Sequence, residues 1–193
     1  TGEIISADVV NKLLAIKLGY NYRKLYGYTE DNDPLMQYIT NLTLHEVGHV
    51  LGLRHNFRGS YLYSPDEIHD KNITGNVLMS SVMDYDPINI APEGVEQGIY
   101  FSTEPGVYDK WAVKFGYTPN LTEEERTALL QQSVKRELTF GTDDDAMSYP
   151  GNNIDPRTKR YDMSNDPIGY AEDIVKIVDQ KINELPEIFS DEE

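Results

Sequence analysis

The sequence predicts a mainly helical chain of the α+β class. Several segments have the apolar spacing or the end signals of helices, and they fall at 8–26, 34–51, 103–115, 122–138 and 166–185. The only candidate for a strand is a short edge segment that contains Ile4-Ile5 and Val9-Val10. The stretches 56–80, 86–100 and 150–167 are expected to be loops, and the last two are marked by Pro, Gly, Asn or Asp.

The first two helices are defined by clear end signals. Gly27 is expected to end the helix at 8–26, because Gly adopts the left-handed conformation common after a helix. Asp33 is the predicted N-cap of the second helix, with Pro34 at its first helical position. The apolar face of the first helix contains Leu13, Leu14, Ile16, Leu18 and Leu25. The buried face of the second is expected to contain Ile39, Leu42, Val47 and Val50.

The later helices follow the same logic. The helix from about Thr103 to Phe115 is expected to stop at Gly116. Thr122 and Glu125 form a capping box at the start of the next helix. That helix continues through Leu129, Leu130, Val134 and Leu138. The last helix begins at 166–167, runs to about residue 185, and is expected to bury Ile174, Val175, Val178 and Ile182.

Composition limits the classes of function. A net charge of −16 argues against nucleic acid and against anionic membrane surfaces as partners. No apolar run approaches the ~20 residues of a transmembrane helix. The chain has no Cys, so disulfides are excluded. The 193 residues suffice for a single domain with its own core, and the opening at Thr1 suggests an excised piece of a longer precursor.

The most informative segment is 45–55, which reads His-Glu-Val-Gly-His-Val-Leu-Gly-Leu-Arg-His. His45 and His49 are four residues apart, so on a helix they project from one face and can bind one metal ion. Glu46 can reach a water molecule at that metal. Gly52 suits a left-handed helix end, after which the chain would bring His55 in as a third ligand. Three His with an open position indicate a catalytic zinc site, since structural sites use four protein ligands.

This run resembles the extended zinc signature H-E-x-x-H-x-x-G-x-x-H of the metzincin metallopeptidases. Metzincins also have a Met-containing turn beneath the metal, and the run 81–85, Ser-Val-Met-Asp-Tyr, is similar to it, with Met83 as the turn residue. The Ser-x-Met-x-Tyr setting resembles the turn of astacins and serralysins, in which the Tyr two residues after the Met lies near the metal. This resemblance implies that Tyr85 is a metal ligand or an oxyanion donor. The alternative for Tyr85 is an ordinary packed aromatic, because the chain has 14 Tyr.

The residue after the third His often marks a metzincin subfamily, and here it is Asn56. The run from His45 to Ser60 looks most like a group of large, poorly characterised bacterial zinc-dependent metallopeptidases, and the motif-level match covers 34–116. The resemblance implies a metzincin-like catalytic domain or fragment over 1–193, with about 1–55 ending in the zinc helix and about 56–193 holding the Met-turn and the C-terminal helices. Only 44 residues precede His45, so the N-terminal sheet of such a domain is expected to be incomplete. The same resemblance implies an extracellular, periplasmic or cell-surface location.

The function expected from these residues is that of a zinc-dependent endopeptidase. Zinc at His45, His49 and His55 would activate water, Glu46 would act as general base, and the partner would be a peptide or protein substrate. A zinc hydrolase acting on another amide is one alternative. A non-catalytic binding module that keeps the fold is a second, although it would have no need of Glu46. A structural zinc site is a third, disfavoured because no fourth ligand stands at suitable spacing.

Three further features carry weaker signals. His69 is expected at the surface, because no ligand partner stands near it at the right spacing. The run 70–75 begins like an EF-hand calcium loop, but its twelfth position is Ser81 where a bidentate Glu is required. An irregular loop is therefore the preferred interpretation there, with a calcium ion as the alternative. Asp143-Asp144-Asp145 is interpreted as a solvated turn.

Overall fold

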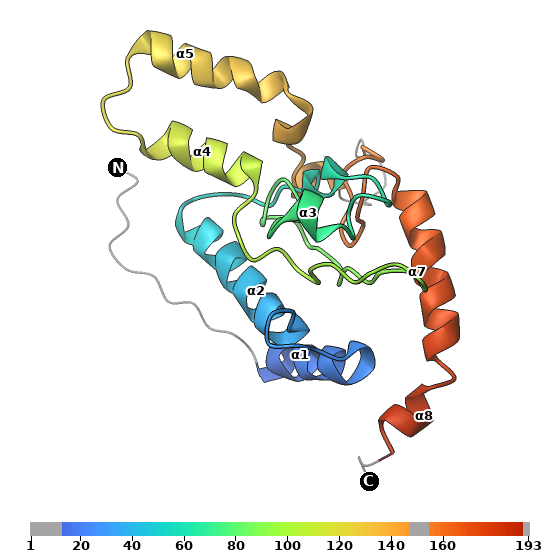
Figure 1. The fold of residues 1–193 in the computed structure, drawn as a ribbon. Coiled ribbons are helices and arrows are strands. Elements are labelled where there is room, and N and C mark those ends of the chain that lie inside the picture. The colour runs from blue at the N-terminus through green and yellow to red at the C-terminus, as the bar shows by residue number, and fades with distance from the viewer. Residues whose placement is uncertain (1–12, 147–154, 191–193) are drawn as a thin grey trace.

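Helices form nearly all the regular structure of the residues that the computed structural model describes, 13–146 and 155–190 (Figure 1). The longer helices are α1 (Leu13–Tyr26), α2 (Pro34–Val50), α4 (Val107–Tyr117), α5 (Glu123–Gln131) and α7 (Pro167–Lys181). The short ones are η1 (Gly59–Leu62), α3 (Lys71–Thr74), η2 (Gln132–Val134), η3 (Arg136–Leu138), α6 (Asp143–Ala146) and α8 (Leu185–Ile188). Over these residues the only β pairing is an isolated bridge between Thr29 and Asn32. The mainly helical prediction is confirmed, whereas the candidate strand at Ile4–Val10 lies outside the described residues.

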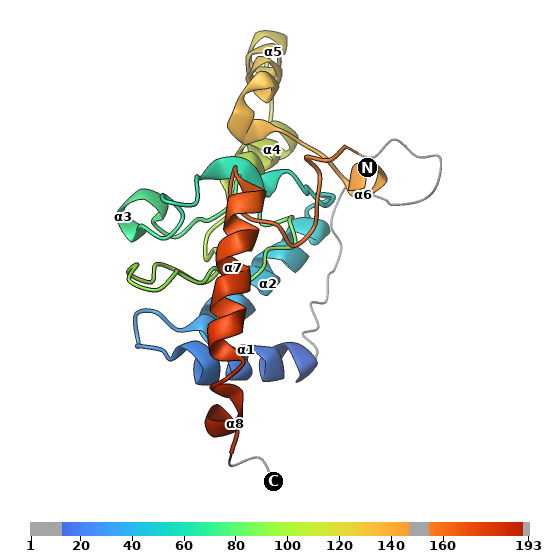
Figure 2. The same ribbon diagram turned by 90° about the vertical axis from the view of Figure 1, so that its right-hand side faces the viewer.

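The helices α1 and α2 pack together, with α1 in the lower part of the molecule and α2 rising from it towards the centre (Figures 1 and 2). Gly19 of α1 lies so close to α2 that an added Cβ would meet the Leu35 side chain at 2.5 Å. Gly27 has φ +72° and ends α1 as predicted. Asp33 caps α2 by accepting from the Leu35 amide at 3.0 Å, and it also pairs with Arg23 of α1. One carboxylate therefore joins the two helices.

The buried face of α2 differs from the predicted one. Val47 is 41% exposed, and Ile39, Leu42 and Val50 are only partly buried. The buried positions are instead Pro34, Leu35, Gln37, Asn41, His45 and Gly48. The reason is that α2 faces a loop rather than a sheet, and the backbone of that loop requires polar partners. The Gln37 amide oxygen accepts from the Tyr100 and Phe101 amides at 2.7 and 3.1 Å, while the Asn41 amide donates to the Ser102 carbonyl at 3.2 Å.

The start of α4 was predicted four residues too early, and Gly116 does not end it. The preceding chain is extended because Gly106 passes against the backbone of Ser80, where an added Cβ would lie 2.0 Å from the Ser80 carbonyl oxygen. The helix ends at Tyr117. Thr118 is extended (ψ 117°), as expected for a residue that precedes a proline.

The capping box of α5 is present, but the helix ends at Gln131 instead of continuing to residue 138. The two 3-10 turns η2 and η3 follow, with Lys135 extended between them. Leu129 and Leu138 are both buried, and nine residues apart on one straight helix they would point in opposite directions. The break lets both side chains pack inward and leaves Val134 at 88% exposure.

The helix α7 runs along one side of the molecule and covers a core that loops supply (Figure 2). Its buried residues are Tyr170 and Ile177, with Ile174 packed against the core. Three of the residues predicted on its inner face, Val175, Val178 and Ile182, are more than half exposed. The other core members are Ile68, Leu78, Met79, Ile99 and Met163, all from loop segments.

No helix among the described residues is long and apolar enough to cross a membrane.

Candidate metal centre

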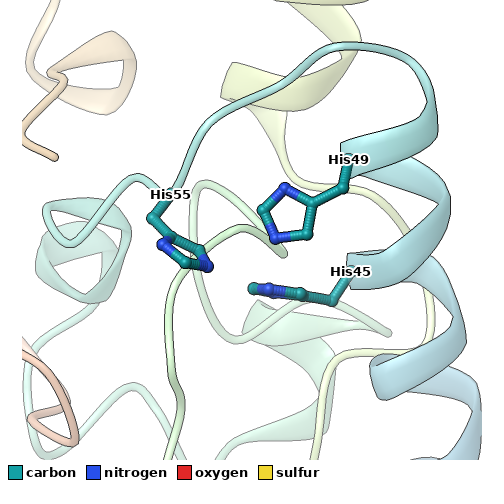
Figure 3. A group of neighbouring side chains, drawn as sticks. All are labelled: His45, His49 and His55. Carbon is teal, nitrogen blue, oxygen red and sulfur yellow. The ribbon is translucent and has the colours of Figure 1, made fainter. Parts of the chain in front are cut away.

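His45, His49 and His55 converge at the end of α2 (Figure 3). The first two project from adjacent turns of the helix, and the third comes from the loop that follows. A Schellman turn makes this possible: Gly52 has φ +85°, its amide donates to the His49 carbonyl at 2.9 Å, and the Leu53 amide donates to the Gly48 carbonyl at 3.0 Å. One ring nitrogen of each His lies within 4.8 Å of the other two, so the group can hold a metal ion.

Each of the three imidazoles is held by a hydrogen bond from its outer nitrogen. His45 Nδ1 lies 2.7 Å from the Val82 carbonyl oxygen, and His49 Nδ1 lies 3.0 Å from the Leu53 carbonyl oxygen. His55 Nδ1 lies 3.0 and 3.1 Å from the two carboxylate oxygens of Asp143. All these partners are acceptors, so each Nδ1 must carry the hydrogen. Each neutral ring then presents an Nε2 lone pair, which is the form that binds metal.

Burial favours the neutral form of the most enclosed imidazole. His45 is only 6% exposed, and its burial lowers the pKa, an effect to which His49 and His55 add. The Asp143 carboxylate, whose side chain is 43% exposed, has a pKa below its usual value. Burial acts to raise its pKa, but the hydrogen bond from His55 and the charge that this ring can carry outweigh burial, so the pKa is lowered. Asp143 is therefore an ionised acceptor beside His55.

The turn at 81–84 packs directly against the metal-facing side of α2. Met83 is fully buried, and an added Cβ at Gly48 would lie 2.2 Å from its sulfur. Gly48, inside the His-Glu-Val-Gly-His run, thus leaves the space that the Met83 side chain occupies. The carbonyl of the neighbouring Val82 is the acceptor that orients His45. The turn consequently supports the helix by packing and the His45 ring by hydrogen bonding.

Asp109 of α4 fixes this turn from the other side. Its carboxylate accepts from the Ser81 hydroxyl at 2.6 Å, the Val82 amide at 2.8 Å and the Gly106 amide at 2.8 Å. Burial raises the pKa of Asp109, and the same hydrogen bonds oppose that rise. Asp109 is only 3% exposed. Its role could not be predicted from the sequence, because its partners Ser81 and Val82 lie almost 30 residues away.

Asn56, the residue after the third His, connects the loop to a distant segment. Its side chain donates to the Thr139 carbonyl at 3.1 Å and accepts from the Gly141 amide at 3.1 Å. The Phe57 amide adds a bond to the Gly141 carbonyl at 2.7 Å. These bonds place the one-turn helix α6 beside the site, with Asp143 against His55. The 88-residue separation in sequence explains why Asp143 was taken for part of a solvated turn.

Tyr85 and Glu46 both line the cavity that the three imidazoles face, which has a volume of about 460 Å³. The Tyr85 hydroxyl lies 3.0 Å from His55 Nε2 and donates to it, since the Nδ1 hydrogen leaves that nitrogen an acceptor. Burial raises the Tyr85 pKa above its usual value, so the phenol is neutral. Glu46 is half-buried at the cavity wall. The predicted proximity of Tyr85 to the three His is therefore found.

The remaining predicted features lie apart from this centre. His69 is 7% exposed and stacks on Tyr170 at 6.4 Å between ring centroids, so its predicted surface position is wrong. Its place near the loop-built core explains the burial, which lowers its pKa. In the calcium-like run, the Asp70 carboxylate caps α3 through the Asn72 amide at 2.8 Å. Ser81 donates to Asp109, so both ends of that run are engaged in other contacts.

Comparison with known proteins gives one match. A family model described as Met-zincin covers residues 28–193, which includes every residue of the centre. No curated protein and no solved structure matches the chain.

Proposed function

Because the chain belongs to the Met-zincin family, we propose that it is a zinc-dependent endopeptidase with His45, His49 and His55 as the metal ligands. The observation that carries this proposal is the set of three hydrogen bonds from Nδ1. These bonds leave three neutral Nε2 lone pairs directed inward, which suits a divalent ion of the zinc type. Imidazole sites also bind nickel or cobalt, so the three His are compatible with these ions as well as with zinc.

The bound metal would supply the Lewis acidity that lowers the pKa of a water molecule towards ~7. Glu46 would accept a proton from the water molecule whose oxygen attacks the scissile carbonyl carbon. The same carboxyl group delivers the proton to the nitrogen as the C–N bond breaks, which balances the hydrolysis. The position of Glu46 in the cavity wall, one residue from His45, supports this assignment.

Tyr85 is proposed to act at the same centre. Its hydroxyl lies 3.0 Å from His55 Nε2 and lines the same cavity, so it would be close to a substrate carbonyl oxygen bound there. A neutral phenol there donates to the negative charge that develops on that oxygen. Ligation of the metal by the phenol oxygen in the resting enzyme is the second role that this position supports. An extracellular or cell-surface site of action remains a prediction from family resemblance.

The test combines metal binding with hydrolysis. Zinc titration of the chelator-treated protein should give one high-affinity site, and casein or a peptide library should be cleaved only after zinc is restored. Glu46→Gln should keep the affinity for zinc and lose about 10²–10⁴-fold in kcat, the usual contribution of a general base. His69→Gln is the matched control, because it removes the one His outside the centre. Unchanged zinc binding after substitution of all three ligands would refute the proposal, as would rapid cleavage by Glu46→Gln.

A further inference from the structure

The wall of the cavity beside the three imidazoles contains a carboxyl group, that of Asp86, which the proposed hydrolysis does not use. Asp86 lies in this wall, one residue beyond Tyr85. Its carboxylate accepts from the Asn41 amide at 3.2 Å, a neutral partner that is itself fixed to the Ser102 carbonyl at 3.2 Å. No Lys or Arg is among the described residues that line the cavity. Asp86 therefore presents a carboxyl group to the cavity without a cation from the described part of the wall. Burial raises the pKa of Asp86 to about 7, and a cation bound beside it would favour the ionised form.

Two aromatic rings accompany this carboxylate. Tyr38 lines the cavity from α2, and it is near enough to Asp86 for that negative charge to add to the effect of burial in raising the Tyr38 pKa. Tyr161 lines the cavity from the C-terminal segment, 69% exposed, with its ring stacked on Tyr85 at 5.8 Å between centroids. Its backbone is left-handed (φ +64°) and its amide donates to the Tyr85 carbonyl at 3.0 Å, so the ring is held at the cavity by its main chain.

A carboxylate beside aromatic faces is the combination that binds a guanidinium or an ammonium group. The carboxylate accepts charge-assisted hydrogen bonds, and the ring faces attract the cation. We propose that Asp86, Tyr38 and Tyr161 form a subsite for the cationic side chain of a peptide substrate, an Arg or a Lys close to the bond that is cut. This inference rests on the proposed function for the hydrolysis, but the binding of the cation rests on the cavity alone.

The first experiment measures binding without hydrolysis. The Glu46→Gln protein, loaded with zinc, is titrated into fluorescein-labelled hexapeptides with one central Arg, citrulline or Glu in an Ala-Gly frame, and anisotropy gives each Kd. Citrulline has nearly the shape of Arg and no charge. We expect Arg to bind about 10–100-fold more tightly than citrulline, the range of a hydrogen-bonded charged pair, and Glu to bind most weakly. Equal affinity for Arg and citrulline would overturn the inference.

Two further variants, made in the Glu46→Gln background, assign the preference to the subsite. Asp86→Asn is nearly isosteric, keeps an acceptor for Asn41, and should remove most of the preference for Arg. Tyr161→Asn removes an exposed ring and tolerates a left-handed backbone, so it tests the subsite even if Asp86→Asn fails to fold; it should weaken Arg binding about 2–5-fold and leave citrulline unchanged. Asp179→Asn, an exposed carboxylate on α7, controls for the net charge. A preference that survives both subsite variants would contradict the assignment.

Hydrolysis by the parent protein separates the two claims. If the Arg peptide is cleaved with a higher kcat/KM than the citrulline peptide, both claims stand. If no peptide is cleaved but the Arg preference in binding is present, the proposed function fails and the subsite stands. If peptides are cleaved at equal kcat/KM and bind equally well, the proposed function stands and the subsite is wrong.

Discussion

The two sides of the metal centre are built differently. On the helix side, His45 and His49 stand one turn apart on α2, and their Nδ1 atoms donate to backbone carbonyls. On the loop side, His55 follows the helix end, and its Nδ1 donates to the side chain of Asp143, 88 residues away. The spacing of His45 and His49 is thus set by the helix, although His45 also depends on the Val82 carbonyl 37 residues away. The loop side depends on a distant side chain instead of a backbone group.

This difference has an energetic consequence. A backbone carbonyl cannot be removed by substitution and carries no net charge, whereas a carboxylate contributes charge and can be deleted. Substitution of Asp143 on the loop side should therefore lower metal affinity moderately. Substitution of a His on the helix side should lower it much more. The acceptors differ also in depth, because the Asp143 side chain is 43% exposed and Val82 is 6% exposed.

The largest expected effect is on the helix side. His45→Ala removes a proposed ligand whose ring is almost fully buried. We expect zinc affinity to fall by more than ~100-fold, which exceeds the usual loss when only the hydrogen-bond partner of a ligand is removed. Competition titration with a chelator of known affinity measures the change. His69→Gln should leave the affinity unchanged, and a similar loss in both variants would point to a general failure of folding.

The next effect separates the two sides directly. Asp143→Asn should lower zinc affinity about 10–100-fold, because His55 loses an ionised acceptor that fixes its tautomer and makes its Nε2 more basic. Asp144→Asn is the control: this neighbour has a 78% exposed side chain and pairs with Arg54 at 3.3 Å. The visible spectrum of the cobalt-loaded protein should change with Asp143→Asn alone. Identical affinities for the two variants would show that the carboxylate does not act on the metal.

The same contrast explains what could be predicted from the sequence. The convergence of His45, His49 and His55, the left-handed Gly52 and the cap at Asp33 all depend on short spacings, and each is found in the structure as predicted. The burial of polar residues on α2 was not predictable from its apolar pattern. These side chains are buried because they hydrogen-bond the backbone of a loop that lies about 60 residues later in the sequence.

Asp143, Asp109 and Asn56 escaped prediction for the same reason. Each acts through partners that are distant in sequence, and none stands in a spacing that indicates its role. The errors on α7 have another origin. Val175, Val178 and Ile182 follow a helical apolar pattern, but the loop-built core takes up only the face that carries Tyr170 and Ile177. Periodicity identifies an amphipathic helix without showing which of its apolar residues are covered.

A smaller effect is expected on stability from the contacts that hold the loop side. Asn56→Ala would leave the Gly141 amide and the Thr139 carbonyl without their partner, and we expect a loss of about 2–4 kcal/mol in the free energy of unfolding. Urea denaturation measures it, with Asn183→Ala, an exposed amide in the turn between α7 and α8, as control. Zinc affinity should fall together with stability, because α6 loses its anchor. Normal affinity in a destabilised variant would mean that Asp143 is positioned by other contacts.

The smallest effect concerns a buried acid next to the loop side. Burial raises the pKa of Asp162 to about 6, although the nearby Ser60 hydroxyl acts to lower it. Below about pH 4 this group is protonated in both folded and unfolded chains and costs nothing. As the pH rises from about 4 to about 6, the unfolded chain releases the proton more readily, so stability falls, and it levels off above the folded pKa. Asp162→Asn cannot ionise and should gain about 1–2 kcal/mol over the parent at pH 8, after allowance for partial exposure, and little at pH 4. Thermal unfolding at several pH values, with Asp179→Asn as the exposed control, measures this difference. A constant gap between parent and Asp162→Asn from pH 4 to pH 8 would show that ionisation of Asp162 does not weaken the loop side.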